Sequence, residues 1–178
     1  MAKKLLVLCM AAIMAVAALV AGCGGDQKAA SDNKVLKVGT NADFAPFEFQ
    51  DENGKEYQGF DMDLIRAIGE EMGYKVEISN IQFDGLIPAI QAGNIDVAIT
   101  GMTINEERKQ NVLFSDPYYK SGLSIIVAKD NNDIKTFQDL KGKKVAVQIG
   151  TTSAAEVNKI GGVDVKEFNS SADTFMEL

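Results

Sequence analysis

One short segment carries the residues best suited to bind a small charged molecule. Thr103 and Glu106 have the spacing of a capping box, so a helix is expected to start at Thr103. Free main-chain N–H groups at a helix start attract anions, and the Arg108 guanidinium can add a two-pronged contact to a carboxylate. Gly101 lets the main chain approach a bound molecule closely. The segment therefore predicts a receptor for a small carboxylate-bearing molecule; the alternative is an ordinary strand, loop and helix with a surface arginine.

The elements that would position this segment form a regular pattern. Residues 95–99 are β-branched and mostly apolar, which predicts a buried strand, and similar runs predict strands at 35–39 and 74–78. Between them lie two helical stretches that end at Gly73 and Gly93, and the first should bury Leu64, Ile68 and Met72. Residues 51–54 predict a turn. Alternating strands and helices with short links favour a parallel sheet with helices on both faces, whose ligands bind at the carboxyl ends of the strands.

The second half of the chain begins the same pattern again. Residues 114–119 break the helical periodicity, and 123–128 predict a strand long enough to cross between two lobes. A polar turn at 131–133 places the lobe boundary near residue 129. Beyond it we expect a helix at 137–140, a strand at 145–149, a helix reaching 160, a strand at 163–168 and a helix from about 172.

Composition excludes several function classes. The chain has 178 residues, a net charge of −7, no His and two Cys. An acidic chain without a basic face argues against nucleic acid. The absence of His removes the commonest metal ligand and general base. Cys9 and Cys23 both lie near the N-terminus, so the folded part offers no disulfide and no Cys nucleophile. We therefore expect no catalytic residue, no metal and no cofactor.

The N-terminal residues have the features of an export signal. Lys3 and Lys4 precede an apolar run over 5–21, and Val20-Ala21-Gly22-Cys23 resembles the bacterial lipobox. This predicts a lipoprotein signal peptide at 1–22, acylation of Cys23 and a flexible tether at 23–34. The alternatives are a transmembrane anchor, for which the run is slightly short, and an incidental cysteine.

Four motifs follow one another along the chain, at 59–64 (Gly-Phe-Asp-Met-Asp-Leu, followed by Ile68, Gly69 and Met72), 100–108, 114–119 and 140–147. In this order they resemble the substrate-binding proteins of polar amino-acid ABC importers, the extracellular solute-binding family 3, and among them the glutamine-binding members. The resemblance covers 35–178. It implies an α/β, periplasmic-binding-protein-like type II fold, with two α/β lobes and a ligand cleft between them. Lobe 1 would occupy 35–128, including the first hinge strand, and an incomplete lobe 2 would occupy 129–178.

The resemblance also implies roles for individual residues. Arg108 would pair with the α-carboxylate of an amino acid, helped by the amides of Thr103 and Thr152, while the Gly101 carbonyl and the Thr103 hydroxyl would receive its α-ammonium. Aromatic walls and contacts to the far end of the ligand would complete the cleft. The full implied ligand set is Asn41, Phe44, Phe83, Thr100, Gly101, Thr103, Arg108, Gln148, Thr151 and Thr152.

Each role has a structural alternative. The aromatic walls Phe44 and Phe83 could be core residues, and Thr151 and Thr152 could merely start a helix. The resemblance implies that Asn41 and Gln148 contact the far end of the ligand, but Asn41 could instead be a turn residue. Asp61 and Asp63 are interpreted as helix-start residues favoured by the helix dipole.

Two departures from the family pattern bear on the ligand. The glutamine-binding members have Asp and Lys where this chain has Asn41 and Gln148. No acid in the polar set balances a basic ligand side chain, which favours a neutral polar ligand such as glutamine. Family members also continue beyond residue 178 and supply there an acidic partner for the ammonium and a second crossing strand. We therefore expect a C-terminally truncated chain that does not reach the closed, tight-binding state.

The expected function is capture of a polar amino acid, without chemistry, for delivery to an ABC permease in the membrane. The expected location is the outer face of the bacterial cytoplasmic membrane, held by the lipid anchor, or the periplasm. We expect a monomer, with no nucleic-acid partner. The alternatives are an enzyme on the same fold, similar to cyclohexadienyl dehydratase, and the sensor domain of a receptor.

Overall fold

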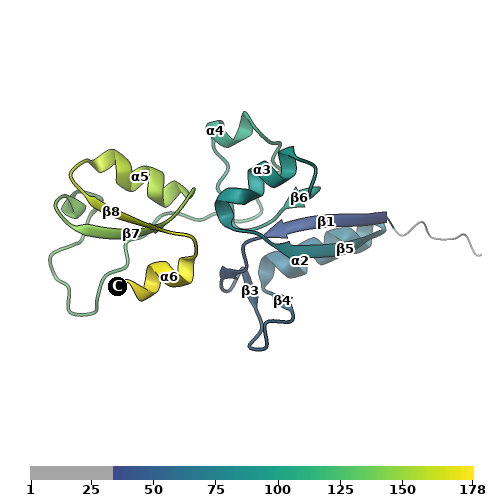
Figure 1. Ribbon diagram of the computed structural model, residues 1–178, viewed down its shortest axis with the longest axis horizontal. Helices are drawn as coiled ribbons and strands as arrows, with labels where there is room; N and C mark the ends of the chain where they lie inside the picture. The colour runs from purple at the N-terminus through teal and green to yellow at the C-terminus, as the bar shows by residue number, and fades with distance from the viewer. Residues whose placement is uncertain (1–33) are drawn as a thin grey trace, which may run out of the picture. The chain divides into compact units, whose positions relative to one another are not determined.

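The computed structural model describes residues 34–178 (Figure 1). The predicted signal peptide, Cys23 and the tether up to residue 33 lie outside the described residues. No helix of residues 34–178 is long and apolar enough to cross a membrane. The elements are β1 (Lys34–Thr40), β2 (Asp43–Phe44), β3 (Glu48–Gln50), β4 (Tyr57–Gln58), α2 (Phe60–Met72), β5 (Tyr74–Asn80), η1 (Phe83–Gly85), α3 (Leu86–Gln91), β6 (Val97–Ala98), α4 (Glu106–Lys109), η2 (Phe137–Leu140), β7 (Lys144–Gln148), α5 (Thr152–Ile160), β8 (Asp164–Phe168) and α6 (Ser171–Met176).

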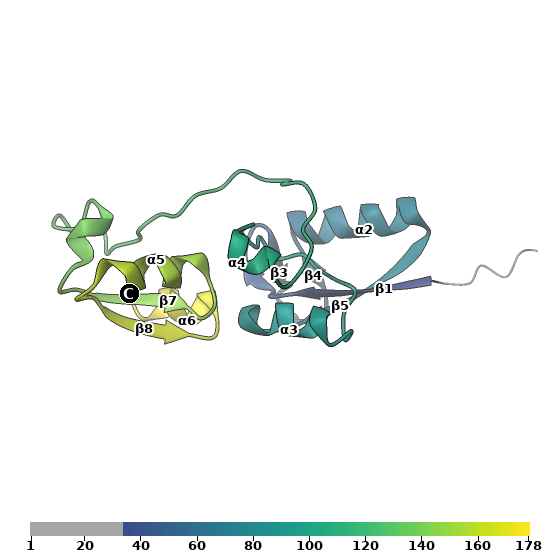
Figure 2. The same ribbon diagram turned by 90° about the horizontal axis from the view of Figure 1, so that it is seen from above.

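A parallel sheet forms the centre of the first lobe, as predicted, and its strand order is β5-β1-β6. Val38 of β1 lies opposite Ile78 of β5 and Val97 of β6, and its side chain is fully buried. Figure 2 shows α2 and α3 on opposite sides of this sheet, which confirms the predicted layering. β6 is shorter than the predicted strand, although Ile99 still donates its main-chain N–H to the Gly39 carbonyl.

The buried face of α2 differs from the predicted one. Met62, Ile65 and Gly69 are buried, at the three- and four-residue spacing of one helix face. Ile68 and Met72, two of the three positions predicted to face the core, are 39% and 59% exposed. That prediction was wrong because tertiary contacts, rather than apolar spacing alone, set the rotation of the helix.

Those contacts come from a small antiparallel sheet of order β2-β3-β4, whose hairpin confirms the predicted turn at 51–54. The main-chain N–H groups of Phe60 and Asp61 donate to the carbonyls of Pro46 and Phe47. These bonds tie the first turn of α2 to the loop between β2 and β3, so Asp61 and Met62 point inward and are fully buried.

The second lobe is built around the parallel pair β7–β8. Its core consists of Leu140, Val147, Ala154 and Val157, contributed by η2, β7 and α5. Every predicted element of this lobe is present, with boundaries shifted by at most one residue and the first helix formed as a 3-10 turn.

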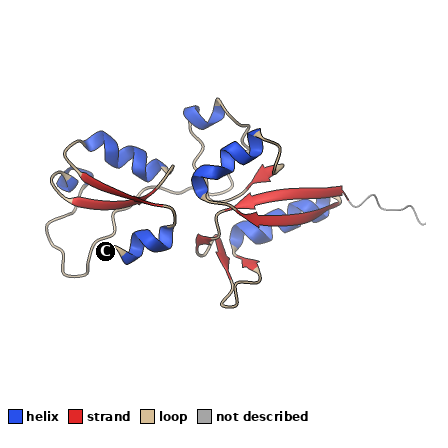
Figure 3. Cartoon of the chain, viewed as in Figure 1, coloured by secondary structure: helices blue, strands red, loops and turns tan. Residues whose placement is uncertain are grey.

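Residues 110–136 connect the two groups of elements without forming a helix or strand (Figure 3). The predicted strand at 123–128 was therefore wrong. Its β-branched composition favours extended backbone, but a strand needs a hydrogen-bonded neighbour, and none of the strands in residues 34–178 pairs with it. The half-buried side chain of Ile125 packs against the core of the second lobe.

Candidate ligand-binding site

The helix that carries Arg108 begins later than the capping-box pattern predicts. α4 starts at Glu106, and Asn105 is its N-cap, with Asn105 Oδ1 accepting from the Arg108 N–H at 2.8 Å. The prediction of a helix start at Thr103 was wrong. Asn105 is at least as good an N-cap residue as Thr103, and the helix forms from Asn105 instead. α4 spans only four residues, so the site cannot depend on a helix dipole.

The Arg108 side chain joins the first lobe to the second. Nη1 donates to the carbonyl of Thr103 at 2.8 Å, and Nη2 donates to the carbonyl of Gly150 at 2.9 Å. The guanidinium carbon also lies 5.4 Å from the centre of the Phe83 ring, which is cation–π geometry. Thr103 and Phe83 belong to the first lobe and Gly150 to the second, so one side chain is held by both.

Arg108 is a buried cation without an acidic partner in the described part of the chain. The residue is 8% exposed, and burial lowers the pKa of its guanidinium, although the nearby charge of Glu107 acts in the opposite direction. None of the ion pairs formed within residues 34–178 includes Arg108. Two of its five N–H groups donate to carbonyls, which are weaker acceptors than a carboxylate. The geometry therefore suits an anionic ligand.

The threonines of the predicted set lie near this arginine. Thr103 Oγ1 and Thr152 Oγ1 are 3.4 Å apart, one from each lobe. Thr151 is the N-cap of α5: its hydroxyl accepts from the Ala154 N–H at 3.2 Å and donates to the Gln148 carbonyl at 2.8 Å. The Thr151 hydroxyl is thus engaged within the protein, whereas within residues 34–178 the hydroxyls of Thr103 and Thr152 bond only to each other.

Asn41 and Gln148 also meet across the lobes. Gln148 Nε2 donates to Asn41 Oδ1 at 2.7 Å and to the Asn169 carbonyl at 3.1 Å. Gln148 Oε1 accepts from the Ser171 hydroxyl at 3.0 Å, and the Ser171 N–H donates to Asp43 Oδ2 at 3.0 Å. Sequence reasoning missed Asp43, Asn169 and Ser171, because only folding brings them to the two amides.

Asp43 adds an acid to this polar cluster. Burial raises the pKa of its carboxyl, while the hydrogen bonds from Ser171 lower it. Its Oδ1 is buried and has no hydrogen-bond partner within residues 34–178. The expectation that the polar set contains no acid is therefore corrected by the fold. The signal available in the sequence was its position two residues after Asn41.

Thr100 and Gly101 are held from behind by two buried acids. Thr100 Oγ1 donates to Glu48 Oε1 at 2.8 Å and accepts from the Asn41 N–H at 3.0 Å. The Gly101 N–H donates to Asp61 Oδ2 at 2.9 Å. Asp61, interpreted from the sequence as a helix-start residue, thus also anchors the turn that follows β6.

The two aromatic residues of the predicted set differ in their surroundings. Phe83 is half-buried beside Arg108, whereas Phe44 is 45% exposed and stacks on Phe47 with 6.1 Å between ring centres. The structure therefore brings Phe83 to the arginine, whereas the Phe44 ring stacks on that of Phe47.

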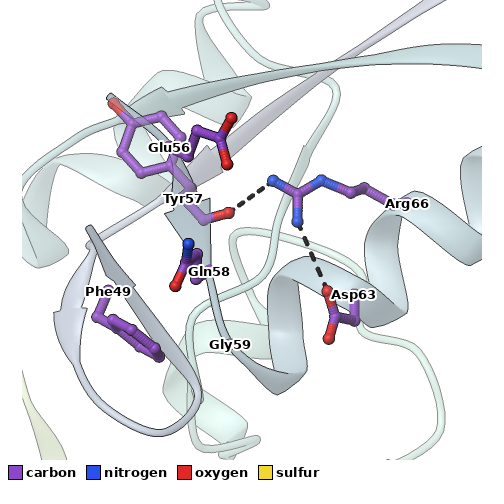
Figure 4. Close-up of a pocket in the computed structure, with 7 residues that line it drawn as sticks. All are labelled: Phe49, Glu56, Tyr57, Gln58, Gly59, Asp63 and Arg66. Atoms are coloured by element: carbon purple, nitrogen blue, oxygen red, sulfur yellow. Dashed lines mark hydrogen bonds and ion pairs between the residues drawn. The ribbon is translucent and has the colours of Figure 1, made fainter. Parts of the chain in front are cut away.

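A separate hollow lies on the first lobe. It has a volume of about 610 Å³ and is lined by residues of β3, β4 and α2 and by the residues that flank β4, none of them from the predicted ligand set. Figure 4 shows Arg66 donating to the Tyr57 carbonyl and reaching Asp63, at 2.6 Å and 3.6 Å. This hollow is open to solvent and its arginine already has an acidic partner, so the buried cross-lobe cluster around Arg108 is the stronger candidate site.

Comparison with known proteins places these features in a family. The model of the bacterial extracellular solute-binding proteins, family 3, matches residues 36–176. The arginine-binding extracellular protein ArtP of Bacillus subtilis (strain 168) is 34% identical over 180 residues, covering 99% of this chain and 69% of that protein.

Solved structures agree with the sequence match. An ancestral arginine-binding protein bound to arginine has a TM-score of 0.79 and 54% identity, covering 81% of this chain and 65% of its own. An ancestral arginine-binding protein bound to glutamine has a TM-score of 0.78 and 54% identity, covering 81% of this chain and 64% of its own. The ancestral amino acid-binding protein AncCDT-1, a precursor of cyclohexadienyl dehydratase, has a TM-score of 0.77 and 48% identity, covering 80% and 64%.

These matches settle the fold and the family. The chain spans about two thirds of the length of these relatives. The two α/β units and the similarity to the amino-acid-binding proteins confirm the type II periplasmic-binding-protein-like fold, of which this chain contains part of the second lobe. The chain belongs to the bacterial extracellular solute-binding proteins, family 3.

Proposed function

We propose that this protein binds a polar amino acid and delivers it to an ABC importer. The observation that carries the proposal is the buried Arg108 guanidinium, which contacts both lobes and has no acidic partner within residues 34–178. A carboxylate can accept two parallel N–H bonds from such a group, and charge-assisted bonds of this kind are about twice as strong as neutral ones. The α-carboxylate of an amino acid is a ligand of this class.

The remaining contacts support an orientation for the ligand. The Gly101 carbonyl and the Thr103 hydroxyl would receive the α-ammonium, and Phe83 would flank the side chain. Asn41 and Gln148 would contact its far end, with Asp43 close behind them. Thr100 and Thr151 would support the main chain around the ligand, because their hydroxyls are already bonded within the protein.

Arginine is the first candidate ligand and glutamine the second. Asp43 supplies the acid that a cationic side chain requires, and relatives with about half of their residues identical are described as bound to arginine and to glutamine. The neutral amides of Asn41 and Gln148 suit the amide of glutamine. Isothermal titration calorimetry with arginine, lysine, glutamine, histidine and glutamate tests this ranking. Heat with arginine or glutamine supports the proposal, and no heat with any of the five overturns it.

Release to a permease would follow opening of the lobes. A ligand that contacts both lobes favours their closed arrangement, and a nearly complete shift from open to closed requires about 5.5 kcal/mol of differential binding. We further propose that acylation of Cys23 anchors the exported protein at the outer face of the membrane, and that the protein acts as a monomer. Radiolabelled palmitate incorporation in cells, lost in Cys23→Ala, tests the anchor.

An enzymatic role would need an acid or base in contact with the substrate. Glu48, whose carboxyl pKa is raised to about 9 mainly by burial, is only 1% exposed and lies behind Thr100. We therefore favour binding without chemistry over a cyclohexadienyl dehydratase-like enzyme. Turnover of prephenate or arogenate by the purified protein would reverse this preference.

A further inference from the structure

Two carboxyl groups meet in the interior of the first lobe, behind the turn at Thr100 and Gly101. Glu48 of β3 is 1% exposed and Asp61 of α2 is fully buried. Their carboxyls accept hydrogen bonds from the adjacent residues Thr100 and Gly101, and Glu48 Oε1 would lie only 4.0 Å from a Cβ added at Gly101. Neither belongs to any of the ion pairs formed within residues 34–178. Two buried acids therefore face each other without a cation to neutralise them.

One oxygen of each carboxyl accepts hydrogen bonds from the turn or its surroundings. Glu48 Oε1 accepts from Thr100 Oγ1 at 2.8 Å, and Asp61 Oδ2 accepts from the Gly101 N–H at 2.9 Å and from the Tyr118 hydroxyl at 2.8 Å. The other two oxygens, Glu48 Oε2 and Asp61 Oδ1, are buried and have no donor in the described part of the chain. A proton held between them would satisfy both.

Electrostatics favours that proton over two charges. Burial raises the pKa of Glu48 to about 9, and although the Thr100 hydrogen bond lowers it, the charge and hydrogen bond of Asp61 raise it further. Asp43, on the neighbouring strand, is an additional negative charge acting in the same direction. The remaining titratable neighbour is Tyr118, whose pKa is raised by burial and by Asp61, so its hydroxyl stays neutral and donates. Two adjacent buried carboxylates would each carry an uncompensated desolvation cost.

We propose that Glu48 and Asp61 share one proton, and that this acid–carboxylate pair, with a single negative charge, positions the Gly101 turn and the Tyr118 end of the connecting segment for ligand binding. The ligand part of this proposal rests on the proposed function, whereas the shared proton does not.

The pair is placed to act on two parts of the binding machinery at once. Asp61 is the common acceptor for Gly101, whose carbonyl would meet the ligand ammonium, and for Tyr118, which lies near the start of the segment leading to the second lobe. Glu48 and Asp61 are thus positioning residues that touch no ligand themselves.

The shared proton is tested first in the parent protein, without any amino acid present. Side-chain carboxyl carbons are labelled with ¹³C and followed by NMR from about pH 4 to about pH 10, a range that spans the ordinary and raised carboxyl pKa values. We expect one carboxyl of the pair to remain protonated above about pH 7, with the two signals moving together because coupled groups titrate as a unit. Two independent titrations below about pH 5 would overturn the proposal.

The positioning role is tested by amide exchange at Gly101 and by ligand affinity. Asp61→Ala removes the acceptor, so we expect the Gly101 amide to exchange at least about tenfold faster and arginine to bind at least about tenfold more weakly. Asp63→Ala, on the exposed face of the same helix turn, is the matched control. An unchanged Gly101 exchange rate in a folded Asp61→Ala variant would overturn the positioning role. If arginine does not bind even to the parent protein, the comparison of Gly101 amide exchange between the parent and Asp61→Ala still tests the positioning role.

A third variant separates charge from packing. Glu48→Gln keeps the shape of a protonated Glu48 and its donor toward Asp61, so the coupled titration should disappear while the Gly101 amide stays protected. Glu52→Gln, the same change on the exposed hairpin, should preserve the coupled titration. A coupled, raised titration that persists in Glu48→Gln would show that another group holds the proton. If Glu48→Gln does not fold, the titration of the parent protein remains decisive.

Discussion

The Arg108 guanidinium donates to the Gly150 carbonyl at 2.9 Å, so a cation of the first lobe is held by the main chain of the second. A carbonyl carries only a partial charge, whereas a ligand carboxylate carries a full one and can engage two N–H groups. We propose that an amino acid binds at this contact between the lobes.

Arg108→Lys should bind arginine at least about a hundredfold more weakly than the parent, because a lysine ammonium cannot make the planar two-pronged contact. Arg66→Lys, an exposed arginine on α2, is the matched control and should bind like the parent. Calorimetric titration measures both. Affinity within about threefold of the parent in Arg108→Lys would exclude a two-pronged contact.

Asp43→Asn should change the preference between ligands. The substitution removes the negative charge beside Asn41 and Gln148, so binding of arginine should weaken by about tenfold or more while binding of glutamine changes little. Asp133→Asn, an exposed site in the connecting segment, serves as the control. An equal loss for both ligands would mean that Asp43 acts on the fold rather than on selectivity.

Gly150→Ala should weaken ligand binding through a cross-lobe clash. Gly150 has φ +75°, and an added Cβ would lie 3.0 Å from Cβ of Asp84, which belongs to η1 of the first lobe. Gly142→Ala has a similar φ of +77° and open space around the added atom, so it isolates the cost of backbone strain. Both variants should lose about 1 kcal/mol of stability, but only Gly150→Ala should lose affinity.

Met62→Ala should cost about 2–5 kcal/mol of unfolding free energy, because Met62 is fully buried in the core of the first lobe. Met72→Ala on the same helix is a solvent-facing control at 59% exposure and should change stability by less than about 0.5 kcal/mol. Urea unfolding followed by circular dichroism distinguishes them. The reverse ranking would support the α2 face predicted from the sequence.

The pH dependence of stability should follow from Glu48. Its folded pKa of about 9 lies above the ordinary glutamate value of 4.5, so between these limits the folded protein holds a proton that the unfolded chain has lost. Unfolding free energy should therefore fall with rising pH through this window, by up to about 1.4 kcal/mol per pH unit, and level off above it. The raised pKa of Asp43 contributes with the same sign. Urea unfolding across this range should show a much smaller slope in Glu48→Gln, and an equal slope would contradict the assignment.

Local sequence signals were sufficient for much of the fold. β1, β5 and α2 have apolar periodicity and clear ends, such as Gly73 with its φ of +71°, and these elements appear where predicted. The N-cap at Asn105 and the missing strand at 123–128 show the limits. Two good caps lay within three residues of each other, and a strand exists only if another strand pairs with it.

The candidate site was predictable where a residue type alone specifies chemistry. Arg108 was identified because few side chains suit a carboxylate, and the fold places it between the lobes. Asp43 and Ser171 are separated by 128 positions and Glu48 and Thr100 by 52, so no local pattern connects them. Their pairing depends on how β2, β3 and the second lobe pack, which short-range periodicity does not encode.

The most direct test compares arginine with agmatine, its decarboxylated analogue, by calorimetric titration into the same protein. Agmatine keeps the guanidinium end and lacks only the carboxylate that Arg108 is proposed to hold. We expect arginine to bind, and agmatine to bind at least about a hundredfold more weakly. Equal binding of the two, or no binding of arginine, would contradict the central claim.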